Sequence, residues 1–163
     1  MDAAQLFNAL QQSTLASSFF DESMFRGADG ASCKTFSPGT VLFREGEPSD
    51  SFYVVHSGHV ALDMTVPTRG PIRLLTVGPG EIVAWSALVS DGRMTTSATA
   101  VDEVRAVEFS GTALLRRCEM QPELGYRLMR RLAAALAKRL LATRLQMLDL
   151  FSADAHVDNG GVL

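Results

Sequence analysis

The chain has 163 residues, of which 47% are hydrophobic and 20% are charged, and its formal net charge is −3 at pH 7. This length and apolar content suit one domain with a well-filled core, and no apolar run approaches the roughly 20 residues that span a membrane. The first residues lack a basic leader followed by an apolar stretch, so we expect no secretion signal and a cytoplasmic location.

The sequence divides into three regions, and the first two, a helical one and a β-rich one, precede Ser110. Apolar residues between positions 3 and 25 are spaced for short helices, which glycines at 27 and 30 end. From Ser32 to Phe109, short β-prone runs such as FYVVH and IRLLTV alternate with turn signals such as Pro38-Gly39 and Gly78-Pro79-Gly80. This alternation predicts an antiparallel sandwich or barrel.

The pattern becomes helical after Ser110. We predict a short helix from Thr112 to Cys118 and a long helix from Pro122, at its first turn, to Phe151. Residues 152–163 are small and polar, which predicts a disordered tail. The predicted domain therefore covers 1–151, with N-terminal helices in 1–30, a β-barrel in 31–109 and C-terminal helices in 110–151.

The stretch from Gly78 to Ala100 has the features of an anion site. A Gly-Pro-Gly turn leads into a short helical run, Ala84 to Val89, and polar residues 90–92 end this run before Arg93. Backbone N–H groups at a helix start carry partial positive charge, and an arginine grips the same anion with a planar fork of donors. The stretch predicts a phosphate pocket; the alternative is that Arg93 is a solvated charge on a polar loop.

The order of helix, small β-barrel and long helix resembles that of the cyclic-nucleotide-binding domain family. The segment FSPGTVLFREGEPSDSFYVVHSGHVAL is similar to the opening strands of that family, with Gly39, Gly46 and Gly58 at its turns. Gly80 to Thr96 falls where the family has its phosphate-binding cassette. The resemblance covers Phe7 to Phe151 and is closest to bacterial regulators of the catabolite-activator and fumarate-nitrate-regulator type. It implies a mainly β fold, a double-stranded β-helix (jelly-roll) barrel with N-terminal helices and a long C-terminal helix.

The resemblance also implies which residues contact a ligand. Backbone N–H groups would face a cyclic phosphate, one arginine would neutralise it and hydroxyl groups would add donors. These phosphate contacts would come from Ala84, Trp85, Ser86, Ala87, Arg93, Thr95 and Thr96. The apolar wall beneath sugar and base would come from Leu74 and Val60, and Thr143 on the long helix would lie near the purine, often across a dimer.

One position departs from the family pattern. Cyclic-nucleotide binders usually carry Gly-Glu in the cassette, where the carboxylate accepts a hydrogen bond from the ribose 2′-hydroxyl; this chain has Ala84-Trp85. An indole offers one donor and cannot accept that bond. An unpaired buried hydroxyl costs about 1–3 kcal/mol, or roughly ten- to a hundredfold in affinity. Trp85 therefore argues against cyclic AMP in the usual pose, and it either fills the pocket, packs under the neighbouring strand or stacks on a ligand.

No metal site, cofactor or catalytic set is predicted. His56 and His59 flank the Ser57-Gly58 turn, but no carboxylate or third ligand follows at a spacing that suits a metal. Two cysteines without a CxxC spacing suggest neither a disulfide framework nor a zinc or iron–sulfur site, and a GxSxG motif is absent. We therefore do not expect an enzyme.

Mostly apolar residues recur along the long helix at alternating spacings of three and four residues, which is a heptad seam. It consists of Tyr126, Met129, Ala133, Leu136, Leu140, Thr143, Met147 and Leu150. Such a seam predicts a homodimer, with core packing as the alternative, and a second apolar set, Leu124, Leu128 and Leu132, is expected to face the barrel. Residues 110–151 hold 8 basic and 3 acidic side chains. We expect this basic face to be solvated or paired within the protein rather than to bind nucleic acid.

The expected output is regulation. Twelve residues follow Phe151, too few for the helix-turn-helix domain that transcription regulators of this family append. We therefore expect a standalone sensor that binds a cyclic nucleotide or related anionic metabolite and signals through a protein partner by population shift. One alternative is a degenerate domain with a filled pocket that serves as a dimeric interaction module. A DNA-binding regulator would require a longer chain.

Overall fold

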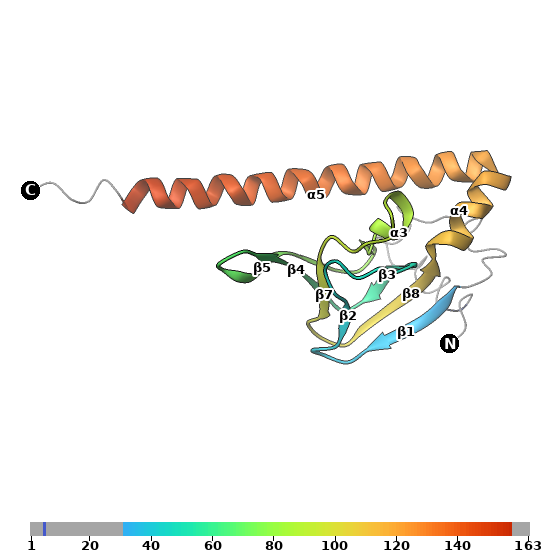
Figure 1. The fold of residues 1–163 in the computed structure, drawn as a ribbon, viewed down its shortest axis with the longest axis horizontal. Helices are drawn as coiled ribbons and strands as arrows, with labels where there is room; N and C mark the ends of the chain where they lie inside the picture. Colours follow the sequence, from blue (N-terminus) through green and yellow to red (C-terminus); the bar gives the residue numbers. More distant parts are fainter. Residues whose placement is uncertain (1–4, 6–30, 158–163) are drawn as a thin grey trace, which may run out of the picture.

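The computed structural model describes residue 5 and residues 31–157, which form two β-sheets with a long helix lying along one side (Figure 1). Apart from Gln5, the predicted N-terminal helices in 1–30 lie outside the described residues. The strands are β1 (Ser32–Phe36), β2 (Val41–Phe43), β3 (Ser51–Ser57), β4 (Val60–Val66), β5 (Gly70–Val77), β6 (Ile82–Val83), β7 (Ser97–Ala100) and β8 (Val104–Ser110). The helices are α3 (Ser86–Val89), α4 (Gly111–Met120) and α5 (Pro122–Val157).

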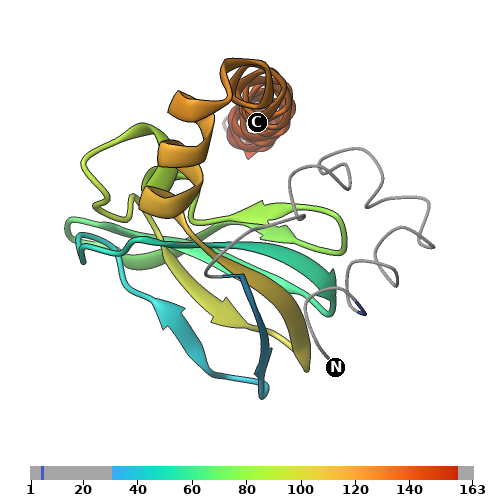
Figure 2. The same cartoon turned by 90° about the vertical axis from the view of Figure 1, so that its right-hand side faces the viewer.

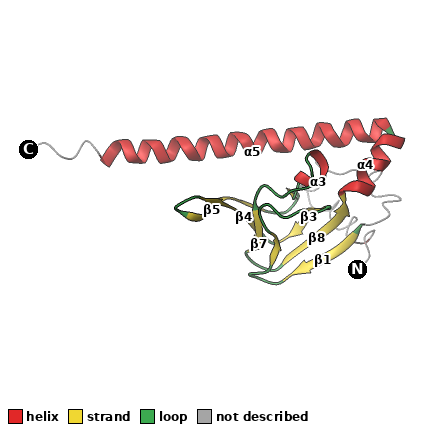
Figure 3. Ribbon diagram, in the orientation of Figure 1, coloured by secondary structure: helices red, strands yellow, loops and turns green. Residues whose placement is uncertain are grey.

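The eight strands form two four-stranded antiparallel sheets, in the orders β1-β8-β3-β6 and β2-β7-β4-β5. Most neighbours within a sheet are far apart in the sequence, as when β3 pairs with β8. Two sheets connected in this way are typical of a jelly roll. The predicted fold class, mainly β with a long C-terminal helix, is therefore confirmed (Figure 3).

The core lies between the two sheets. Phe52 of β3 and Phe109 of β8 are register partners, and their rings stack with centroids 5.0 Å apart. Successive residues of a strand point to opposite faces, so the inward residues of both sheets meet in one apolar layer. This layer also holds the fully buried Val60 and Val107.

The turn between β3 and β4 requires glycine. Gly58 has a φ of +83°, a region that residues with a Cβ rarely adopt. A Cβ at this position would also lie 2.2 Å from the Glu103 carbonyl oxygen. Gly58 therefore allows this turn to lie against the turn between β7 and β8, where Asp102 accepts a hydrogen bond from the His59 N–H.

Helix α5 is held against the barrel by three leucines one turn apart. Leu124, Leu128 and Leu132 are buried with exposed fractions of 2%, 0% and 1%, which confirms the set predicted to face the barrel. Figure 2 looks along α5 and shows it lying over one side of the sheets, beside α4. Gly111 brings the start of α4 close to α3, since a Cβ there would lie 2.5 Å from the Ala87 carbonyl oxygen.

The end of the long helix differs from the prediction. Helix α5 continues to Val157, so residues 152–157 are helical and not part of a disordered tail. Two of these six residues are alanines, which have the highest helix propensity, and neither glycine nor proline interrupts them. Residues 158–163 lie outside the described residues. Within the described part of the chain, no helix has the length and apolar content to cross a membrane.

The predicted heptad seam lies partly against the barrel. Met129 and Leu136 pack against the core, whereas Tyr126, Leu140 and Met147 are exposed. The exposed apolar residues of α5 also include some outside the seam: Leu141, Leu145 and Leu148. The exposed apolar surface of α5 therefore includes part of the predicted seam and extends beyond it to these residues. The side chain of Leu150 lies outside the described part.

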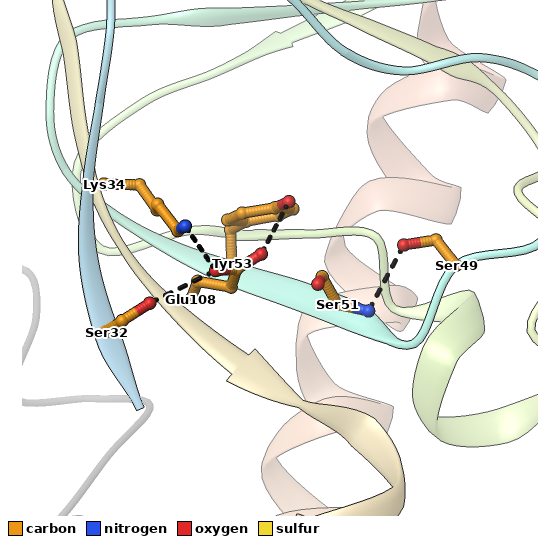
Figure 4. A network of polar contacts seen from close by, with 6 residues as sticks. All are labelled: Ser32, Lys34, Ser49, Ser51, Tyr53 and Glu108. Atoms are coloured by element: carbon orange, nitrogen blue, oxygen red, sulfur yellow. Dashed lines mark hydrogen bonds and ion pairs between the residues drawn. The ribbon is translucent and has the colours of Figure 1, made fainter. Parts of the chain in front are cut away.

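A polar network centred on Glu108 ties three strands together (Figure 4). The Glu108 carboxylate accepts hydrogen bonds from the Ser32 and Tyr53 hydroxyls, each at 3.2 Å, and pairs with Lys34 at 3.2 Å. Desolvation by burial would raise the pKa of Glu108, but donors from Ser51, Lys34 and Tyr53 outweigh it, so this pKa lies below its usual value. Burial and the same carboxylate raise the pKa of Tyr53 to about 12.

We expect Glu108→Gln to lower the free energy of unfolding by about 1–2 kcal/mol at pH 7, because hydrogen bonds to a charged group are stronger than neutral ones. Because the pKa of Glu108 is lower in the folded state than its ordinary value of 4.5, the charged carboxylate stabilises the fold at pH values above 4.5. This contribution is lost as the pH falls through the pKa of the folded state. Urea unfolding at pH 7 and pH 3.5 should therefore show a difference that shrinks in acid. Glu103→Gln is the matched control, since the Glu103 side chain is 63% exposed; an equal loss in both variants would contradict the role of the network.

Candidate functional site

A cavity of about 340 Å³, here called the chamber, lies between β4, β5 and the middle of α5. Its lining residues are Leu62, Met64, Leu74 and Leu75 from the strands, Trp85, Thr95 and Thr96 from the segment between β6 and β7, and Leu136, Arg139, Leu140 and Thr143 from α5. The wall is therefore mostly apolar, with three hydroxyl groups and one cation. Ligand pockets have volumes of roughly 300–1,000 Å³, so the chamber has the size of a ligand site.

The chain reaches the chamber through a left-handed residue. Ala84 has a φ of +65°, a conformation that costs a residue with a Cβ roughly 1–2 kcal/mol. Trp85 follows as the N-cap residue of α3 and makes no capping hydrogen bond through its side chain. Backbone strain of this kind clusters at functional sites because the surrounding structure holds it in place.

Trp85 lines the chamber without filling it. The indole is half-buried and packs against the core residues, and the cavity of about 340 Å³ remains beside it. The sequence left three interpretations of Trp85 open: filling the pocket, packing against the protein, or stacking on a ligand. In the structure the indole packs against the core and leaves the cavity accessible. The indole offers an apolar ring to whatever occupies the chamber.

Arg139 supplies the positive charge of the chamber. Its Nη2 donates to the Ile82 carbonyl of β6, while its Nη1 is buried and has no hydrogen-bond partner among the described residues. Burial lowers the pKa of Arg139 from its usual value and Glu81 opposes that shift, but a guanidinium remains charged in proteins. Buried polar atoms are nearly always hydrogen-bonded, so this Nη1 is a donor that lacks its acceptor.

Half of the residues predicted to contact a ligand line the chamber. These are Leu74, Trp85, Thr95, Thr96 and Thr143. The Thr143 hydroxyl lies within donating distance of the Arg139 and Leu140 carbonyls, at 3.1 and 3.0 Å. Because its hydrogen is directed to these carbonyls, the Thr143 hydroxyl can accept a hydrogen bond from a ligand rather than donate one. Contact between these five residues and a ligand remains a prediction.

Arg93 does not line the chamber, and its role as the cation that neutralises a phosphate remains a prediction. Its Nη1 donates to the Gly46 carbonyl at 3.1 Å, and its Nε lies 3.9 Å from the Asp91 carboxylate. The side chain is 64% exposed. The short stretch around Arg93 pairs with Pro48, which directs it toward the loop between β2 and β3. The cation beside the chamber is therefore Arg139, which the sequence analysis missed.

The other four predicted residues are buried elsewhere. Val60, Ala84, Ser86 and Ala87 are all buried and do not line the chamber. The Ala87 N–H donates to the Ala84 carbonyl at 3.1 Å, so it is not available to an anion. Fewer backbone N–H groups between Ala84 and Ala87 are therefore free for an anion than expected, because α3 is a single turn and the Ala87 N–H is used within it.

His56 and His59 do not line the chamber. His59 Nδ1 lies 2.8 Å from Asp102 Oδ2 at an exposed turn. Burial and the charge of Arg105 lower the pKa of His56. Among the residues that the structure describes, no three His, Cys, Asp or Glu side chains are grouped closely enough to hold a metal ion.

Comparison with known proteins places the chain beside one family. Residues 33–121 match the family model of the cyclic nucleotide-binding domain. The CRP-like cAMP-activated global transcriptional regulator of Mycobacterium tuberculosis is 36% identical over 119 residues, which cover 73% of this chain and 51% of that protein. The chain thus spans about half the length of the curated relatives that it matches first.

Solved structures give the same result. A putative cyclic nucleotide-binding protein from Geobacter metallireducens has a TM-score of 0.68 at 30% identity, covering 82% of this chain and 96% of that one. A cyclic nucleotide-binding domain from Methylobacillus flagellatus has a TM-score of 0.78 at 20% identity, covering 91% and 85%, and at that identity it supports the fold alone.

Proposed function

The chain belongs to the cyclic nucleotide-binding domain family, and on this premise we propose that it is a regulatory domain whose chamber binds a small anionic ligand. The observation that carries the proposal is that Arg139 is the one charged side chain of the described lining, a cation beside a wall that is otherwise apolar or hydroxylic. An anion in the chamber would balance the charge of this guanidinium. The described lining holds no histidine, cysteine or carboxylate, so we assign it no catalytic step.

Helix α5 is the element that would transmit binding. It contributes four chamber residues, Leu136, Arg139, Leu140 and Thr143, and it docks on the barrel through the leucine set that begins at Leu124. A ligand that touches both barrel and helix stabilises the arrangement in which the two are docked. It shifts the population toward that arrangement by its difference in affinity for the two states.

We further propose that α5 pairs with a second copy of the chain. Large apolar side chains project from its C-terminal half, among them Leu141 and Leu145 with exposed fractions of 60% and 54%. Figure 1 shows the C-terminal end of α5 extending beyond the sheets. An apolar helix face of this length that the described residues leave exposed is typical of a helix that pairs with another.

Two arginine variants test the ligand site. We expect Arg139→Gln to weaken anion binding by roughly ten- to a hundredfold, the worth of one hydrogen bond to a charged group, and Arg93→Gln to leave it unchanged. The readout is the fluorescence of Trp85, the single tryptophan of the chain, during titration with cyclic AMP, cyclic GMP and sodium 4-phenylbutyrate. Calorimetry checks each response.

If Arg93→Gln weakens anion binding and Arg139→Gln does not, the anion site lies at Arg93 and the assignment to Arg139 is refuted. If none of the three compounds produces a saturable change, the ligand-binding proposal fails. The remaining reading would then be an interaction module, which the exposed apolar face of α5 also supports. Far-UV circular dichroism shows whether each variant retains its fold.

A further inference from the structure

We infer that the ligand is an organic acid with an aromatic or alkyl body and a single negative charge, rather than a ribosyl nucleotide. The inference rests on the proposed function, because it names the class of ligand that the same chamber takes. Three features carry it: the apolar wall, the single partly occupied cation and the lack of a carboxylate to accept from hydroxyl groups.

The wall suits an apolar body. Four aliphatic side chains of β4 and β5 face Leu136 and Leu140 of α5 across the chamber, and the Trp85 indole joins them. Apolar ligand surface buried against this wall is removed from water, which is favourable, and no polar group of the ligand loses a hydrogen bond in the process. An aromatic ring gains additionally from stacking on the indole.

The same wall disfavours a sugar. The acceptors on the described lining side chains are the hydroxyl oxygens of Thr95, Thr96 and Thr143, and no carboxylate lies among them. A ribose hydroxyl placed against leucine loses its hydrogen bonds to water without replacement. Each hydroxyl left in this state weakens binding by roughly ten- to a hundredfold.

The cation matches one charge. Arg139 is the one charged side chain of the described lining, and its Nη2 is already bonded to the Ile82 carbonyl. One carboxylate in the chamber would balance the single charge of this side chain. A linear nucleotide with several phosphate charges would leave charge buried without a partner, which is costly against an apolar wall.

A matched series of compounds tests the inference by calorimetry on the full chain. The series contains 4-phenylbutyrate, its neutral amide, decanoate, acetate and cyclic AMP. We expect the two large acids to bind, 4-phenylbutyrate to bind at least about tenfold tighter than its amide, and acetate and cyclic AMP to bind more weakly. In Arg139→Gln, the preference for the acid over the amide should vanish.

Substitutions of Trp85 separate the two ligand classes. Trp85→Phe keeps an aromatic ring, so the affinity for 4-phenylbutyrate should remain within about threefold of the unchanged chain. Trp85→Glu places a carboxylate beside the ligand, which repels an acid and accepts from a hydroxyl. We therefore expect a loss of at least about tenfold for 4-phenylbutyrate and a gain for cyclic AMP.

The outcomes distinguish the inference from the proposed function. If cyclic AMP binds tighter than both large acids and depends on Arg139, the inference is overturned while the proposed function stands. Equal binding of 4-phenylbutyrate and its amide overturns the inference as well, since no charge is then recognised. If no compound in the series binds, both fail.

Discussion

Replacing Leu128 with alanine is expected to lower the free energy of unfolding by about 2–5 kcal/mol. Leu128 is fully buried at the centre of the contact between α5 and the barrel, with Leu124 and Leu132 one turn to either side. Removing most of its side chain forfeits the transfer free energy of the buried methyl groups and leaves a cavity. Because α5 also lines the chamber, the variant should weaken ligand binding along with stability.

The measurement is urea unfolding followed by two signals. Trp85 fluorescence reports the environment of the barrel and chamber, and far-UV circular dichroism reports mainly α5, the longest helix of the described chain. Met120→Ala is the control, since Met120 is 83% exposed at the end of α4 and its loss should cost no more than about 0.5 kcal/mol. A loss below about 1 kcal/mol in Leu128→Ala would show that the docking of α5 depends on other contacts.

The strands could be predicted because their signals are local. Turn residues such as Gly58 and Gly80, both with positive φ, mark where the chain reverses, and the β-prone runs between them are short. Burial alternates along β8 from Val107 to Ser110, and this alternation also follows from neighbours in the sequence. The pairing of β1 with β8 is not local and was not predicted; the family resemblance implied only the jelly-roll architecture to which this pairing belongs.

The choice between two arginines could not be made from the sequence. Arg93 lies within the predicted cassette, a few residues after the short helical run, and this position made it the candidate cation. Its partners, the Gly46 carbonyl and Asp91, hold it on the surface instead. Arg139 lies more than forty residues further along and is one of 8 basic side chains in residues 110–151. Its burial beside Ile82 arises only when α5 docks, so no local pattern distinguishes it.

The seam of α5 shows a similar limit. Steps of three and four identify an apolar stripe, but a helix with two such stripes does not reveal how they divide between the barrel and solvent. The structure places Leu136 of the predicted seam against the core and leaves Leu141, outside that seam, exposed. The residues that a partner would cover therefore include Leu141 and Leu145 beside the exposed members of the predicted seam.

We expect the double variant Leu141→Asp, Leu145→Asp to be monomeric where the unchanged chain is a dimer. The two leucines lie four residues apart on one face of α5 and are 60% and 54% exposed. Burying a leucine contributes roughly 1.5–3 kcal/mol, and two-fold symmetry would repeat each substitution in the partner. The dissociation constant should therefore rise by at least about a hundredfold.

Sedimentation equilibrium measures this change, with Met120→Asp as a control that adds the same charge at an exposed residue of α4. A monomeric unchanged chain would refute the pairing of α5, and a dimeric double variant would move the interface elsewhere. The ligand response of the double variant carries a second result. Leu140 lines the chamber and is also 52% exposed, so a paired helix would cover part of its open side. Dimerisation and ligand binding should then strengthen each other, and the monomeric variant should bind the ligand more weakly.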